Sequence, residues 1–364
     1  MKHSHLNPSG RIRNTIMLCV LFFPFILSSC NTKEESKNSQ PATGQQPDET
    51  PDNSDKIVLA YVTAWDSIVP EPDFVTHINY SFGHVNETCD GIRIDNPDRL
   101  KSLVELKQRK PSLKILLSIG GWTSGRFSEM AMKESTRKSF ASDCKRIVDA
   151  FGLDGIDMDW EYPTSSEAGI SSSPEDTGNF NRLMQEIRNA IGNNRLLTFA
   201  SAATGQYYDF KTLTGIVDFV NIMMYDVGIP PYHHSALHRS ERVNTISADE
   251  SIDKHIAAGM PAGKLVLGMP FYGHGDTKTL PYFIDYKDII KLQGFTEKWD
   301  GVAQAPYLEN PQGETVCVYE NARSIALKCE YLLKRQLLGA MYWEYTADDD
   351  AGTLRKAVWE GVMK

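Results

Sequence analysis

The chain has 364 residues, and 38 Lys and Arg against 47 Asp and Glu give it a formal net charge of −9 at pH 7. The first 30 residues hold three of the positive charges and no acid, so removing them changes the charge from −9 to −12. Such an acidic surface argues against a nucleic acid as partner and suits a neutral or cationic polymer.

The N-terminal segment has the pattern of an export signal. Three basic residues precede an apolar run, residues 15–27, that is too short to remain as a membrane-spanning helix. The sequence Leu-Ser-Ser-Cys then ends at Cys30 and is similar to a bacterial lipobox; the alternative is an ordinary secretory signal peptide with a chance cysteine. We therefore expect residues 1–30 to be a lipoprotein signal peptide, with lipidation at Cys30.

Residues 31–55 are rich in Asn, Gln, Ser, Thr, Pro, Asp and Glu and are nearly free of apolar side chains. A segment of this composition cannot bury enough surface to fold, so it is predicted to be a tether. A lipid chain would hold the protein at a membrane surface without a spanning helix. The expected location is the bacterial cell envelope, on the periplasmic face or on the cell surface.

Residues 56–364 are predicted to form one domain with alternating strands and helices. Eight short apolar segments are predicted as strands: residues 57–64, 77–83, 114–120, 155–162, 196–202, 219–225, 265–271 and 339–344. Helical patterns occupy residues 97–109, 127–151, 175–191, 248–259, 321–336 and 352–362. This alternation predicts an α/β fold, a closed (β/α)8 TIM barrel with a short insertion between strand seven and helix seven. A doubly wound sheet would need a glycine-rich turn after the first strand, and Ala-Trp-Asp-Ser at residues 64–67 is not one.

The segment Asp154-Gly-Ile-Asp-Met-Asp-Trp-Glu161 has the strongest chemical signal in the chain. On a strand, Asp157, Asp159 and Glu161 share one face. Their repulsion raises at least one pKa, so that one carboxylic acid can keep its proton near neutral pH and donate it to a leaving group. A calcium loop or a turn cap is the alternative, but calcium loops need a turn glycine and a later bidentate Glu, and here the interleaved residues are bulky and apolar.

Aromatic side chains gather at the predicted C-terminal strand ends, where barrels of this kind carry their active sites. Sugar rings offer apolar faces to such side chains, so a row of them favours carbohydrate over plain barrel packing. The predicted substrate-binding residues are Tyr61, Phe82, Ser118, Trp122, Met223 and Trp343.

The order D-x-x-D-x-D-x-E, closed by Trp-Glu-Tyr-Pro at residues 160–163, resembles glycoside hydrolase family 18, which contains chitinases and some endo-β-N-acetylglucosaminidases. Further segments resemble motifs of the same family: residues 118–122, 223–226, 259–273 and Trp343. The resemblance covers the whole predicted barrel and implies a glycosidase without a cofactor.

The resemblance also implies roles for individual residues. Glu161 would be the general acid and base, Asp159 would turn toward the acetamido group of the substrate, and Asp157 would lie behind it, held by Ser118 and Tyr61. In the same way, Tyr225 and Asp226 would position the acetamido group, and Trp343 would form the floor of the cleavage subsite. Asp154 lies on the opposite face and is expected to be structural.

The implied reaction is chitinase-like hydrolysis of β-1,4-linked N-acetylglucosamine polymers or oligomers, with the acetamido oxygen of the substrate as nucleophile. Two alternatives remain open. The protein would cut the chitobiose core of N-glycans, or it would be a catalytically weak carbohydrate-binding lipoprotein. A monomer that binds an N-acetylglucosamine glycan is expected in each case.

Two segments depart from the family pattern. The loop after the sixth strand carries His233, His234 and His238, without an acidic or cysteine partner in the sequence. We therefore expect a surface loop that shapes the leaving-group side, and no metal site. Residues 274–320 are shorter than the insertion domain of processive members, which predicts an open cleft.

Four cysteines lie in the predicted domain: Cys89, Cys144, Cys317 and Cys329. Their spacing does not fit a metal site. Cys144 shares a helical apolar register with neighbouring side chains and is predicted to be in the core. One disulfide is compatible with an exported protein, but the sequence does not select a pair.

Overall fold

The computed structural model describes residue 53 and residues 55–364. Cys30, the predicted signal peptide and nearly all of the predicted tether lie outside the described residues, so the lipid anchor and the tether stay predictions. Among the described residues, no helix combines the length and the apolar character that a membrane crossing requires.

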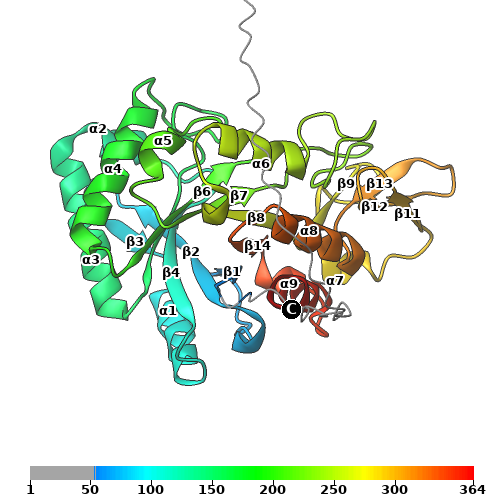
Figure 1. The fold of residues 1–364 in the computed structure, drawn as a ribbon, viewed down its shortest axis with the longest axis horizontal. Coiled ribbons are helices and arrows are strands. Elements are labelled where there is room, and N and C mark those ends of the chain that lie inside the picture. Colours follow the sequence, from blue (N-terminus) through cyan, green and yellow to red (C-terminus); the bar gives the residue numbers. More distant parts are fainter. Residues whose placement is uncertain (1–52, 54) are drawn as a thin grey trace, which may run out of the picture. The chain divides into compact units, whose positions relative to one another are not determined.

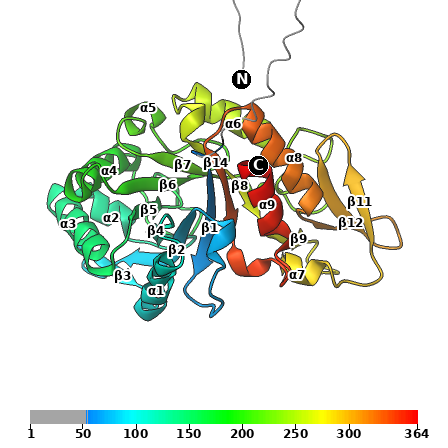
Figure 2. The same ribbon diagram turned by 60° about the horizontal axis from the view of Figure 1, so that its bottom comes forward.

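Eight parallel strands form the centre of the domain (Figure 1). They are β1 (Ile57–Thr63), β2 (His77–Val85), β4 (Lys114–Gly120), β5 (Gly155–Asp159), β6 (Leu196–Ala202), β7 (Phe219–Met223), β8 (Leu265–Pro270) and β14 (Gly339–Trp343). Within the described residues each strand pairs with the next in this order, and β14 pairs with β1, so the barrel is closed (Figure 2). The predicted (β/α)8 fold is confirmed, and the short strand β3 (Ile92–Ile94) adds only an antiparallel edge to β2.

Helices cover the outside of the barrel, except for α7, which lies in the insertion that follows β8. They are α1 (Pro97–Val104), α2 (Phe127–Met132), α3 (Glu134–Phe151), α4 (Asp176–Ile191), α5 (Phe210–Leu213), α6 (Ala248–Ala257), α7 (Tyr286–Ile289), α8 (Ala322–Lys334) and α9 (Thr353–Met363). Short 3-10 turns occupy Pro72–Phe74, Glu105–Gln108, Ala262–Lys264 and Tyr345–Ala347. The predicted helix at residues 127–151 is divided into α2 and α3, because Lys133 has an extended backbone.

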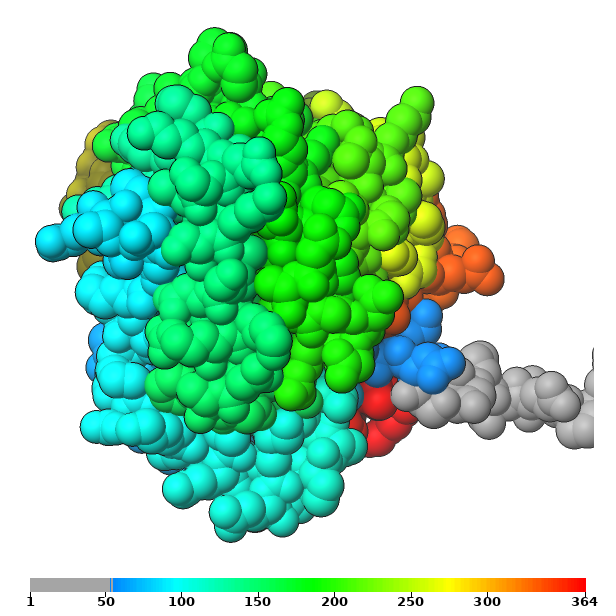
Figure 3. All heavy atoms as spheres, turned by 90° about the vertical axis from the view of Figure 1, so that its left-hand side faces the viewer, coloured from blue at the N-terminus to red at the C-terminus, as the bar shows by residue number. Residues whose placement is uncertain are grey.

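Helix α3 illustrates why these segments form helices and where they pack. Its apolar side chains recur every three to four residues, and Phe140, Cys144 and Ile147 are buried. The predicted core position of Cys144 is therefore confirmed. Helix α3 packs beside α4, and the two form a continuous surface in the space-filling view (Figure 3).

The insertion between β8 and α8 is a small antiparallel sheet. It consists of β9 (Tyr272–Gly275), β10 (Phe283–Asp285), β11 (Thr296–Asp300), β12 (Ala305–Glu309) and β13 (Thr315–Val318), in the order β10-β9-β13-β12-β11. Figures 1 and 2 both show this sheet beside the barrel, near α8. A short insertion was predicted, but the sequence did not indicate this separate sheet. All four cysteines in the described residues are free thiols.

Strand β5 fixes the direction of the acidic side chains. Trp160, directly after β5, is fully buried on the outer side of the sheet, stacked on Phe127 at 5.4 Å and beside Phe180 at 6.2 Å between ring centroids. Because side chains alternate along a strand, this packing turns Asp157 and Asp159 to the inside of the barrel. The predicted alternation of β5 is confirmed, although the strand ends at Asp159 and not at residue 162.

Candidate active site

A cavity of about 910 Å³ lies at the C-terminal ends of the barrel strands. Most of the predicted site residues line it: Tyr61, Phe82, Trp122, Asp159, Glu161, Met223, Tyr225, Asp226 and Trp343. Asp157 and Ser118 do not line the cavity and are fully buried. The structure thus brings together site residues predicted on six of the eight barrel strands, and it buries two of them, Asp157 and Ser118, beneath the cavity.

Asp157 is held by four donors beneath the cavity. Tyr61 and Ser118 donate to its Oδ2 at 2.9 and 2.8 Å, as the family resemblance implied. Thr198 and Asn221 donate to Oδ1 at 2.5 and 3.1 Å, and sequence analysis missed both. Burial raises the pKa of Asp157, and these hydrogen bonds oppose that rise without cancelling it. Thr198 lies opposite Asp157 in the register of β5 and β6, a relation that could have pointed to it.

Asp159 and Glu161 occupy the cavity side of the same acidic row. Burial, then the charges of Glu161 and Asp157, raise the pKa of Asp159 well above its usual range. Burial also raises the pKa of Glu161 to about 7, with Tyr162 lowering it and the charge of Asp226 raising it. The Oδ1 atom of Asp159 has no hydrogen-bond partner among the described residues. Glu161 is thus suited to donate a proton near neutral pH.

Two glycines at the end of β4 bring the acidic strand close to its neighbour. A Cβ atom on Gly120 would lie 1.9 Å from the carbonyl oxygen of Asp159, and one on Gly121 would lie 2.8 Å from the ring of Phe82. Both glycines also have a positive φ, of 134° and 92°. A larger residue at either position would therefore collide with the backbone of Asp159 or with the ring of Phe82.

Aromatic rings form the floor and the rim of the cavity. Trp343 stacks on Phe82 at 5.7 Å with an interplanar angle of 19°, and it lies 5.5 Å from the ring of Tyr61. At the rim, Trp122 is 55% exposed and Trp65 is 69% exposed. Both indole rings line the cavity, so a ligand bound there would cover part of their exposed apolar surface. The arrangement can hold the apolar faces of several sugar rings in a row.

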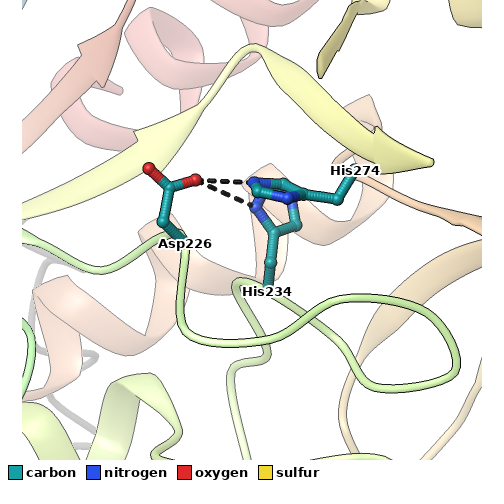
Figure 4. A group of neighbouring side chains, drawn as sticks. All are labelled: Asp226, His234 and His274. Atoms are coloured by element: carbon teal, nitrogen blue, oxygen red, sulfur yellow. Dashed lines mark hydrogen bonds and ion pairs between the residues drawn. The ribbon is translucent and has the colours of Figure 1, made fainter. Parts of the chain in front are cut away.

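Asp226 sits at the side of the cavity among polar partners. Tyr272 Oη and His274 Nε2 each donate to its Oδ1 at 2.6 Å, and His234 Nδ1 lies 3.8 Å from the same oxygen (Figure 4). Burial raises the pKa of Asp226, but the interactions with His234 and His274 outweigh it and hold the pKa below its usual range. Tyr225 lines the cavity next to it, and its Oη has the sulfur of Met341, at 3.9 Å, as its hydrogen-bond partner among the described residues.

The histidine loop differs from the prediction. His233 and His234 are buried, so they do not form a surface loop. Acidic partners are also present: Asp226 for His234, Asp300 at 3.3 Å from His233, and Asp249 for His238 at 2.7 Å. The expectation that these histidines lack an acidic partner is wrong, because the folded chain brings the carboxylates of Asp226 and Asp249, which flank the loop, and of the distant Asp300 beside them.

Asp154 lies away from the cavity, as predicted. Its Oδ2 accepts hydrogen bonds from Lys107 Nζ at 2.7 Å and from the backbone N–H of Ile115 at 2.8 Å. Asp154 thus ties the start of β5 to β4 and to the segment after α1, which confirms its structural role.

Comparison with known proteins assigns this chain to a family. A model of "Glycosyl hydrolases family 18" matches residues 57–348. The chain belongs to glycosyl hydrolase family 18. This family 18 protein is 32% identical over 312 residues to Chitinase A1 of Niallia circulans, with 72% of this chain and 45% of the relative covered. The chain thus spans less than half the length of that relative.

Solved structures of the family share the fold. A family 18 N-acetylglucosaminidase from Paenibacillus barengoltzii is 34% identical, with a TM-score of 0.77 and with 84% of this chain and 99% of that chain covered. The cell-surface chitinase ChiW from a Paenibacillus species is 30% identical, with a TM-score of 0.78 and coverage of 85% and 43%. The resemblance found in the sequence is confirmed, and so is the predicted class of enzyme, a glycosidase, at the level of the family.

Proposed function

We propose that this family 18 protein is a chitinase-like glycosidase that hydrolyses β-1,4-linked N-acetylglucosamine polymers or oligomers. The observation that carries the proposal is the acidic row: Asp159 and Glu161 line an aromatic cavity, and Asp157 is buried beneath them. Glu161, with a pKa of about 7, is the proton donor to the leaving group. The names of the relatives, a chitinase and an N-acetylglucosaminidase, agree with this substrate class.

In the proposed mechanism the acetamido oxygen of the substrate attacks the anomeric carbon and displaces the leaving group, which receives the proton of Glu161. A positively charged oxazolinium ion forms, and Asp159, with Oδ1 free of partners in the described residues, stabilises it. Glu161 then takes a proton from the water that opens the ring. Tyr225 and Asp226 border the cavity where the acetamido group would lie, which supports their proposed positioning roles.

The reaction products would distinguish this function from the two others that the sequence suggests. Cleavage of N-glycan cores uses the same chemistry, and a carbohydrate-binding protein without turnover would use the same aromatic floor. Because Glu161, Asp159 and Tyr225 are all present at the cavity, we favour an active hydrolase. Release of single sugars from chain ends is a further outcome, because one of the relatives is named an N-acetylglucosaminidase.

Product analysis tests the proposal. The protein is incubated with chitin oligomers, with cellulose oligomers of equal length and with a high-mannose glycoprotein, and Glu161→Gln serves as the inactive control. We expect products from the chitin oligomers only, and a kcat reduced by at least about 10² in the variant. Single sugars as the sole product would indicate exo action. Rapid cleavage of cellulose oligomers would contradict substrate assistance, and turnover of the variant at the wild-type rate would contradict the role of Glu161.

We also propose that the protein is a lipid-anchored lipoprotein of the bacterial cell envelope. The support is the sequence alone: the basic start, the short apolar run and Cys30 at the expected cleavage position. A tether between residue 30 and the barrel would let the cavity reach a polymer that is not itself bound to the membrane.

A further inference from the structure

Three side chains from separate parts of the chain meet at one edge of the cavity. Asp226 follows β7, His234 lies in the loop between β7 and α6, and His274 belongs to β9 of the inserted sheet. One ligating atom from each lies within 4.8 Å of the others. In Figure 4 both imidazole rings direct a nitrogen toward the same oxygen of Asp226.

The two histidines are buried, and most of their nitrogens have no partner. The side chains of His234 and His274 are 1% and 0% exposed. Within the described part of the chain, both ring nitrogens of His234 and the Nδ1 of His274 make no hydrogen bond. The 3.8 Å from His234 Nδ1 to Asp226 Oδ1 is too long for one. Within the described residues, the burial of the His234 ring is thus not compensated by any hydrogen bond, which is unfavourable for a polar side chain.

We propose that Asp226, His234 and His274 form a binding site for a divalent transition-metal cation of the Zn²⁺ type. Imidazole nitrogens suit Zn²⁺, Ni²⁺ and Cu²⁺, whereas Ca²⁺ and Mg²⁺ prefer oxygen alone. Ligand atoms about 2.0–2.1 Å from a tetrahedral Zn²⁺ lie roughly 3.3 Å apart. The observed separations from Asp226 Oδ1, 2.6 Å to His274 and 3.8 Å to His234, lie on either side of this value.

A cation can reach these three residues, and its binding would displace one proton. The proton that His274 Nε2 now donates to Asp226 must leave or move to Nδ1 when Nε2 binds a cation, so binding is coupled to proton release. The side chain of Asp226 is 45% exposed and borders the cavity, so a cation can reach the site from solvent. Three protein ligands leave a fourth coordination position for water.

Occupation of the site would have a consequence for hydrolysis, a step that rests on the proposed function. Asp226 is one of the two residues proposed to position the acetamido group. A cation bound to its carboxylate withdraws this negative charge from the substrate, so the cation is expected to inhibit turnover. The inserted sheet supplies His274, so it would provide one ligand of a cation bound beside the catalytic cavity.

Direct binding is the primary test. The untagged full-length protein is dialysed against Zn²⁺ and its metal content is measured, and Co²⁺ is added separately to record the visible absorption of the bound ion. We expect at least about tenfold weaker Zn²⁺ binding in His234→Ala, His274→Gln and Asp226→Asn. The matched control is His238→Ala, on the same loop but paired with Asp249, and its affinity should equal that of the wild type.

The variants also distinguish misfolding from the absence of a metal site and from the absence of hydrolysis. Asp226→Asn alters a partly exposed side chain, so it tests the site even if the buried substitution His234→Ala prevents folding. Equal Zn²⁺ affinity in Asp226→Asn and the wild type would overturn the proposal. Inhibition is read as the ratio of hydrolysis rates with and without Zn²⁺, and it should be lost in His234→Ala. A protein that binds Zn²⁺ at these residues but cleaves no glycan would retain the metal site and refute only the proposed function.

Discussion

The alkaline limb of the pH profile tests the role of Glu161 most directly. Burial raises the pKa of Glu161 to about 7 from a usual value of 4.5. The acid form is the active one, so activity is present below this pKa and is lost above it. At a pKa of 7 about half of the molecules are protonated at pH 7, against about 0.3% at a pKa of 4.5, which is roughly a 150-fold difference in the active form.

The assay is kcat/KM for a soluble chitin oligomer between about pH 4 and pH 10, because kcat/KM reports the ionisation of the free enzyme. We expect a midpoint near 7, followed by a tenfold loss per pH unit. Glu161 and Asp159 interact, so the midpoint belongs to the pair. A midpoint near the usual value of 4.5 would refute the reasoning.

Two substitutions should move this midpoint in opposite directions. Tyr162→Phe removes an interaction that lowers the pKa of Glu161, and Asp226→Asn removes a charge that raises it. A hydrogen bond contributes about 1 kcal/mol net, and 1.36 kcal/mol corresponds to one pH unit, so Tyr162→Phe should raise the midpoint by roughly 0.7. Asp95→Asn, at the same cavity, should leave it unchanged. A shift of the midpoint in the same direction in both variants would contradict these causes of the Glu161 pKa.

Two further predictions concern stability and anchoring. Lys328→Met should lower the free energy of unfolding by about 3–5 kcal/mol, because the fully buried Nζ donates to Glu320 and Ser235 and its loss leaves a buried carboxylate unpaired. Urea denaturation measures the change, and a loss below about 1 kcal/mol would show that the pair is dispensable. Cys30→Ser should release the protein from the membrane fraction, whereas Cys89→Ser should not; unchanged fractionation of Cys30→Ser would refute the lipid anchor.

Periodicity predicted the barrel well because each strand is a short apolar segment followed by a turn. The bounds of β4 and β6 agree with the prediction to the residue. β5 was predicted too long, because the alternation of apolar and acidic residues continues to Glu161 after strand pairing has ended at Asp159. The inserted sheet was missed for the opposite reason. Its strand β11, Thr-Glu-Lys-Trp-Asp, is mostly exposed and has no apolar alternation.

Contacts across the barrel could not be read from the sequence. Asn221 donates to Asp157 across 64 positions, and His274 meets Asp226 across 48. Neither belongs to a local motif, and both contacts depend on strand register and on the path of the insertion. The acidic row was predictable because its residues alternate within one short local segment, whereas the four donors to Asp157 come from other strands.

The depth of each carboxyl group along β5 separates the three proposed chemical roles. Successive side chains on one face of a strand are about 6.5–7 Å apart, so the row runs from the barrel interior to the cavity. Asp157 lies deepest and has four donors, which oppose the rise that burial causes in its pKa. Asp159 lies one step higher, and its Oδ1 has no hydrogen-bond partner in the described residues. This oxygen is therefore free to interact with a cationic intermediate. Glu161 lies nearest the opening and can exchange its proton with water between turnovers. Moving the row by one residue would turn all three carboxyl groups to the helices, so the register of β5 against β4 is itself a condition for catalysis.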